Sequence, residues 1–216
     1  MTSRLAGASL LAAAVLFWLA WLLMPGVGVT DAGTILDLVG QHAGRVRASV
    51  IAQLLSAACY APALVGIVAT RRLRRQRWVR AGAILLSIGA MGSAADAVFH
   101  LLAVEMVGPG VDRAALLPVL ARMQGAGLLL IAPLILAFFV GSGVLALGFV
   151  RAGVVPRANP SLLVLAVALA VVGGPLAAGN PGAARALGLT VLGLVSASQA
   201  WLGAGLWRRQ PGGDGG

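Results

Sequence analysis

The amino-acid sequence predicts an all-α polytopic membrane protein, a bundle of six transmembrane helices with both termini in the cytoplasm. The prediction follows from composition: 60% of the 216 residues are hydrophobic, only 10% are charged, and the mean hydropathy is +0.97. A water-soluble domain has about a quarter charged residues and less than about half apolar ones. The composition therefore excludes soluble enzymes, nucleic-acid readers and disordered chains, and it makes the lipid bilayer the expected partner.

Six apolar stretches are each long enough to cross a hydrocarbon core about 30 Å thick. Only helices suit these lengths, because each backbone amide in lipid must bond within its own segment. The first stretch is longer than the apolar region of a signal peptide and has no clear cleavage site, so we expect it to remain as a helix. The expected spans are residues 5–24, 49–70, 81–107, 123–150, 161–178 and 186–207. They form one domain over residues 1–209, and residues 210–216 are expected to be a disordered tail.

The arginines predict the orientation of these spans. With the N-terminus inside, 11 arginines lie on the cytoplasmic side and five on the outer side, which satisfies the positive-inside rule. The cytoplasmic set is Arg4, Arg71, Arg72, Arg74, Arg75, Arg77, Arg80, Arg151, Arg157, Arg208 and Arg209. The outer set is Arg45, Arg47, Arg113, Arg122 and Arg185. Tryptophans near the span ends, among them Trp18, Trp21, Trp78 and Trp207, are interpreted as interfacial anchors.

Two outer connections precede the second and fourth spans. Apolar residues within residues 30–46 predict a short helix lying on the outer surface, and Thr34 followed by Asp37 is typical of a helix start. The second connection, residues 108–122, contains an apolar segment, so the fourth span is expected to begin earlier or to bend at Pro118.

The third span contains the polar pair with the strongest functional signal. Asp96 and His100 are four residues apart and therefore share one helix face. An acid inside a bilayer costs several kcal/mol unless it faces the protein interior, pairs or is neutralised. The pair indicates either an interhelical hydrogen-bonded lock or a catalytic, protonatable site that exchanges protons or orients a ligand; we favour the second interpretation.

Other polar residues fall at similar depth on neighbouring spans. The second span carries one polar stripe, which should face other helices, and the fourth span has polar residues at its outer end. We expect one pocket that opens to the outside and is walled mainly by the second, third and fourth spans. The predicted ligand-binding residues are Gln53, Ser56, Tyr60, Gln124, His42 and Arg122.

A metal site is not predicted. His42, Asp96 and His100 form a possible set of two histidines and one carboxylate, but their spacing matches no recognised metal motif. A haem held by the two histidines is disfavoured further, because His42 lies in a loop. Small residues one turn apart, such as Gly89 and Ser93, or Ala137 and Gly141, indicate helix packing, with a homo-oligomer as an alternative.

Three stretches carry a resemblance: residues 96–102 (DAVFHLL), residues 123–139 (MQGAGLLLIAPLILAFF) and residues 151–157 (RAGVVPR). Together they resemble uncharacterised six-helix multi-pass membrane proteins of high-GC bacteria, in which such a helix leads into a short Arg-Ala-Gly-x-x-Pro turn. The resemblance implies a six-helix bundle and assigns no catalytic residue.

Our preferred hypothesis is a protein of the cell inner membrane whose polar pocket binds or moves a small or amphiphilic ligand. Asp96 takes or shares a proton, His100 tunes it, and amide and hydroxyl groups orient the ligand. One alternative is a membrane-embedded enzyme that acts on a lipid or isoprenoid, with Asp96 as general acid. The other is a non-catalytic assembly subunit with structural polar pairs. The sequence identifies no cofactor.

Overall fold

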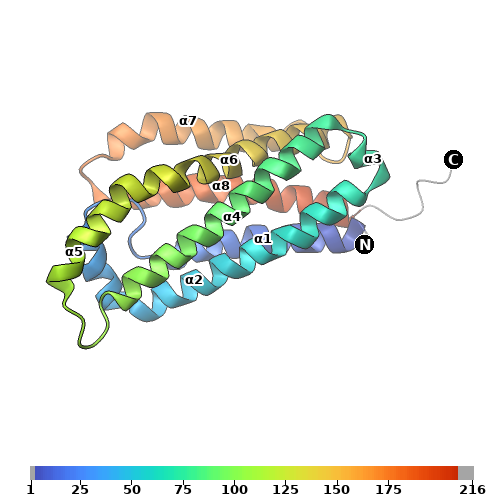
Figure 1. The fold of residues 1–216 in the computed structure, drawn as a ribbon. Helices are drawn as coiled ribbons and strands as arrows, with labels where there is room; N and C mark the ends of the chain where they lie inside the picture. The colour runs from blue at the N-terminus through green and yellow to red at the C-terminus, as the bar shows by residue number, and fades with distance from the viewer. Residues whose placement is uncertain (1–2, 209–216) are drawn as a thin grey trace.

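The computed structural model describes residues 3–208, and these residues form a bundle of helices (Figure 1). Within this described part of the chain, six helices are long and apolar enough to cross a membrane, which confirms the predicted all-α six-helix bundle. They are α1 (Ser3–Leu23), α2 (Ala32–Ala69), α4 (Arg77–Glu105), α6 (Leu128–Arg151), α7 (Asn159–Ala177) and α8 (Pro181–Trp207). Shorter elements are α3 (Arg71–Arg74), α5 (Arg113–Arg122) and the π-helical turn η1 (Met123–Gly127). The predicted disordered tail, residues 210–216, lies outside the described residues.

Helix α2 is longer than the second predicted span because the preceding outer segment is continuous with it. The helix begins after Asp31, whose carboxylate accepts the backbone N–H of Thr34 at 2.8 Å; the predicted start at Thr34 is therefore wrong. These hydrogen bonds from Thr34 lower the pKa of Asp31. The backbone leaves helical geometry at His42 (φ −132°, ψ 29°), so the outer segment and the span form one kinked helix.

The sequence predicts that the outer segment of α2 lies on the outer surface. In the structure this segment is instead packed against other elements. Leu36 and Val39 are 0% and 5% exposed. Leu36 belongs to a small core with Met106, which directly follows α4, and with Leu120 of α5. Packing against two neighbouring elements buries more apolar surface than an interfacial position would, and it places this segment beside the candidate site.

The fourth membrane helix begins early, as expected. Asp112 accepts the backbone N–H groups of Ala114 and Ala115 at 3.0 and 3.2 Å and so starts α5. Helix α5 contains Pro118 and runs directly into η1 and then α6. The departure from α-helical geometry is the π turn at Met123–Gly127, which widens the backbone next to the candidate site.

Glycines bring the backbones of α4 and α6 into direct contact. A Cβ atom added at Gly89 would lie 2.3 Å from the Cα of Phe138, and one at Gly141 would lie 2.5 Å from the backbone nitrogen of Leu86. The interpretation of Gly89 and Gly141 as packing residues is therefore confirmed. Because no side chain separates these helices, α4 and α6 hold their register closely and fix the residues that they present to the site.

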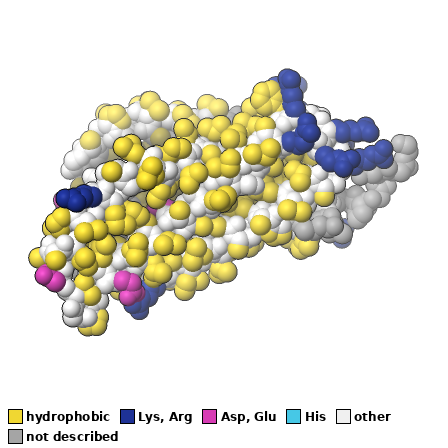
Figure 2. Space-filling model, in the orientation of Figure 1, with side chains coloured by type: hydrophobic (Ala, Val, Ile, Leu, Met, Phe, Trp, Pro, Cys, Tyr) yellow, Lys and Arg dark blue, Asp and Glu magenta, His cyan; other side chains and the backbone are white. Residues whose placement is uncertain are grey.

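Both described ends of the chain lie at the end of the bundle that carries α3 (Figure 1). There, α1 and α8 meet through Gly7, where an added Cβ would lie 2.6 Å from the carbonyl oxygen of Gly203. Figure 2 shows most of the visible arginine side chains gathered at this α3 end, with hydrophobic side chains along the flank. Arg77 and Arg151 place their guanidinium carbons 5.3 and 4.6 Å from the ring centroid of Trp78.

Candidate functional site

A cavity of about 280 Å³ lies at the end of the bundle away from α3. Its walls come from the end of α1, the loop over residues 25–30, the outer segment of α2, α4, α5, η1 and α6. The apolar lining includes Met24, Val27, Val29, Ile35, Leu38, Val39, Phe99, Ala103, Leu120 and Ile131. The polar lining side chains are Trp21, Thr30, Asp96, His100 and Gln124. The cavity is thus an apolar chamber with a small polar cluster, as is typical of small-molecule sites.

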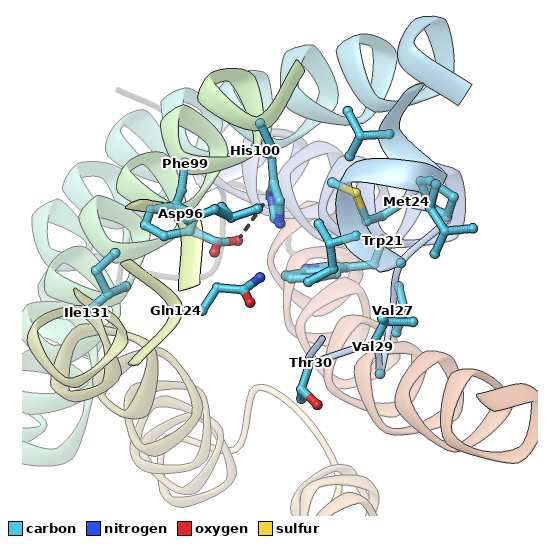
Figure 3. Close-up of a pocket in the computed structure, with 18 residues that line it drawn as sticks. Trp21, Met24, Val27, Val29, Thr30, Asp96, Phe99, His100, Gln124 and Ile131 are labelled. Carbon is cyan, nitrogen blue, oxygen red and sulfur yellow. Dashed lines mark ion pairs between the residues drawn. The ribbon is translucent and has the colours of Figure 1, made fainter. Parts of the chain in front are cut away.

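Asp96 and His100 lie together in the cavity wall on α4, one turn apart (Figure 3). The Nδ1 atom of His100 is 3.7 Å from the Oδ2 atom of Asp96, and the two side chains are 23% and 16% exposed. The predicted shared face is confirmed. At 3.7 Å the contact is an electrostatic one and too long for a hydrogen bond, so each group keeps capacity for another partner.

Gln53 holds the carboxylate from the neighbouring helix. Its Nε2 atom donates to the Oδ2 atom of Asp96 at 2.9 Å, and the Gln53 residue is 2% exposed. The amide itself is behind the cavity wall and does not line it. Gln53 therefore positions Asp96 and ties α2 to α4, whereas the carboxylate faces the cavity.

Trp21 is part of the site, whereas its position near a span end predicts only an interfacial anchor. Its ring lies edge-on to the His100 ring, with centroids 6.0 Å apart and an interplanar angle of 88°. Among the described residues, neither the indole Nε1 of Trp21 nor the Nδ1 of His100 has a hydrogen-bond partner, and both atoms are buried. Buried polar atoms without partners are uncommon, and here two of them border one cavity.

Gln124 completes the polar cluster from the neighbouring element η1. Figure 3 shows its side chain close to Asp96, and Thr30 on the loop also lines the cavity. Gln124 belongs to η1, whose π-helical turn sets where the amide points. The structure places Gln124 in the wall of the same cavity as Asp96 and His100.

The structure places the other predicted site residues away from this cavity. Ser56 is 0% exposed and donates to the carbonyl oxygen of Ala13 at 2.8 Å. Arg122 is exposed at the end of α5, and His42 occupies the kink of α2. Neither lines the cavity. Among residues 3–208, no three His, Cys, Asp or Glu side chains form a metal-binding group, so the set of His42, Asp96 and His100 is not assembled.

Tyr60 belongs instead to a buried hydrogen-bond chain at the centre of the bundle. Its hydroxyl donates to the Oε1 atom of Gln199, and the Nε2 atom of Gln199 donates to the Oγ atom of Ser142 at 2.6 Å. Ser142 in turn donates to the carbonyl oxygen of Phe138 at 2.7 Å. The chain links α2, α8 and α6. Sequence reasoning missed Gln199 and Ser142, although a lone glutamine in an apolar span is a signal for such a contact.

The walls of the cavity also differ from the prediction, which assigned them mainly to the second, third and fourth spans. The end of α1 and the loop over residues 25–30 form one side. Arg185 holds this side in place: its guanidinium donates to the carbonyl oxygens of Met24 and Pro25 at 2.9 and 2.6 Å. These carbonyls follow α1 and have few other partners, so a cation from α8 stabilises the helix end.

The site has the parts for proton exchange and for ligand binding in one place. A carboxylate, an imidazole and an indole N–H meet beside apolar walls, in a space partly shielded from water. In such surroundings a hydrogen bond to a charged group is stronger than in water. The chain matches no protein-family model, no curated protein and no solved structure, so its resemblance to six-helix membrane proteins of high-GC bacteria stays a prediction.

Proposed function

We propose that this chain is a protein of the cell inner membrane whose cavity binds or moves a small amphiphilic ligand, with a proton shared at Asp96 and His100. In this proposal the α3 end faces the cytoplasm, since arginines concentrate there, and the cavity opens toward the outside. Both chain termini are then cytoplasmic.

The observation that carries the proposal is a carboxylate in the wall of a mostly apolar cavity. A helix that only needed to pack would avoid an acid within the membrane, because its burial is costly. Asp96 is also 16% exposed toward the cavity, and Gln53 supplies just one hydrogen bond to it. This arrangement keeps a charged or protonatable group available to a ligand.

Filling the cavity is expected to abolish ligand binding. Ala103 lines the cavity from α4 and is 3% exposed, so Ala103→Phe would occupy part of the 280 Å³ space. We expect purified protein in non-ionic detergent to bind phenylbutanol, an uncharged amphiphile, and the variant to bind it at least about tenfold more weakly. Titration calorimetry measures both affinities. Ala168→Phe, on the exposed side of α7, is the matched control and should bind like the wild type. Equal binding by the wild type and Ala103→Phe would refute the proposed site.

A further inference from the structure

We infer that the cavity selects amphiphilic cations, molecules with an ammonium group on an apolar body, over neutral or anionic molecules of the same shape. This inference rests on the proposed function and adds the ligand class. It follows from the charges, the free hydrogen-bonding capacity and the aromatic groups of the cavity wall.

The charge in the cavity comes from Asp96. Within residues 3–208, no arginine lines the cavity, although this end of the bundle carries several. Two of these arginines are already engaged: Arg185 with backbone carbonyls, and Arg113 with the carboxylate of Asp37 at 2.6 Å. His100 is the other titratable group in the wall. An ionised Asp96 therefore gives the cavity a negative potential, which favours a cation and opposes an anion.

The carboxylate of Asp96 has room for a further donor. A carboxylate can accept about four hydrogen bonds, and the described contacts supply one, from the neutral amide of Gln53. His100 lies too far away to donate a second. Gln124 lines the same cavity close to Asp96 (Figure 3), and its amide, turned by rotation of the side chain, can present its oxygen as a second acceptor for the same group. An ammonium group between them would be bound by two acceptors.

Aromatic and aliphatic groups form the remaining surface. Trp21 and Phe99 both line the cavity close to the Asp96 pair. Aromatic rings attract cations and also pack against hydrocarbon. The aliphatic walls formed by α2, α5 and α6 suit an apolar body extending from the ammonium group.

The test compares three molecules that differ only in their polar group: phenylbutylamine, phenylbutanol and phenylbutyrate. In non-ionic detergent at neutral pH, we expect the protonated amine to bind about tenfold more tightly than the alcohol, and the carboxylate to bind most weakly. Asp96→Asn should lower the affinity for the amine to that for the alcohol, and it keeps an oxygen that can accept from Gln53. Glu105→Gln removes an exposed carboxylate from the same helix and should change nothing.

The affinities of the wild-type protein alone distinguish failure of cation selection from failure of the proposed binding function. If the alcohol binds to the wild type as tightly as the amine, or phenylbutyrate binds most tightly, cation selection is overturned and the binding cavity stands. If none of the three binds, the proposed function itself fails. Displacement of the amine by short-chain phosphatidylethanolamine, but not by phosphatidylglycerol, would identify a lipid headgroup as the source of the ammonium group. Absence of displacement by either lipid would identify a free amphiphilic amine.

Discussion

Replacing Gly89 with alanine is expected to lower the melting temperature of the purified protein and to destabilise the bundle by about 1–3 kcal/mol. The added methyl group would lie 2.3 Å from the Cα of Phe138 and 2.5 Å from its backbone nitrogen. The clash is with backbone, which cannot swing aside as a flexible side chain can. Helices α4 and α6 would have to separate, and the residues they contribute to the cavity would move apart.

Gly143, on α6, gives the matched control. A Cβ added there meets nothing within 4 Å, so Gly143→Ala should keep or slightly raise the melting temperature, because alanine favours helix more than glycine does. The test is therefore whether the melting temperature falls in Gly89→Ala and is kept or raised in Gly143→Ala. Equal melting temperatures for the two variants would mean that α4 and α6 do not touch as described.

Replacing Gln199 with leucine is expected to cost about 1–3 kcal/mol of stability, since it leaves the buried hydroxyl of Tyr60 without an acceptor. Leucine has nearly the volume of glutamine, so the loss reports on hydrogen bonding more than on a cavity. Ser142 keeps its bond to the carbonyl oxygen of Phe138 and is less affected. The melting temperature in detergent measures the effect.

A double variant tests the physical reason for this cost. Tyr60→Phe removes the hydroxyl that Gln199→Leu leaves stranded, so the double change should destabilise the protein by less than the sum of the two single changes. Strict additivity would show that Tyr60 and Gln199 do not act on each other.

Local sequence rules predicted the spans and the Asp96 pair well. Long apolar stretches must be helical in lipid, and a four-residue spacing places Asp96 and His100 on one face whatever the helix packs against. The stripe on α2 was also correctly placed toward other helices, since Gln53, Ser56 and Tyr60 are all buried. Periodicity fixes which side of a helix turns inward, and that was enough for these residues.

The partners across the bundle could not be predicted in this way. Residues of one stripe on α2 form hydrogen bonds to three different helices: Gln53 to α4, Ser56 to α1, and Tyr60 to α8. These contacts depend on the order of the helices around the bundle. Local patterns in one sequence do not reveal which helices are neighbours. For the same reason, the sequence predicts only an interfacial position for Trp21. Only the fold brings its ring beside His100.

The predicted position of the outer segment before the second span is also wrong. Its apolar residues suited a helix at a membrane surface, yet they pack under α5 and form a wall of the cavity. The two positions require the same amphipathic pattern, and only contacts with residues far along the chain distinguish them.

In the proposed function, water reaches the cavity beside Asp96 from outside the cell, and the reactivity of a single thiol can show whether it does. Cys59 is the only cysteine in the sequence, so a Cys59→Ser background allows one new thiol to be placed at Gln124, in the cavity wall close to Asp96. Thiols react as thiolates, which require water. We expect Gln124→Cys to react with a charged, membrane-impermeant thiol reagent added outside intact cells, and Ala168→Cys, exposed at the middle of α7 and therefore facing lipid, to stay unmodified. A Gln124→Cys thiol that resists the reagent, or reacts only when the reagent is admitted to the cytoplasm, would show that the cavity does not open to the outside.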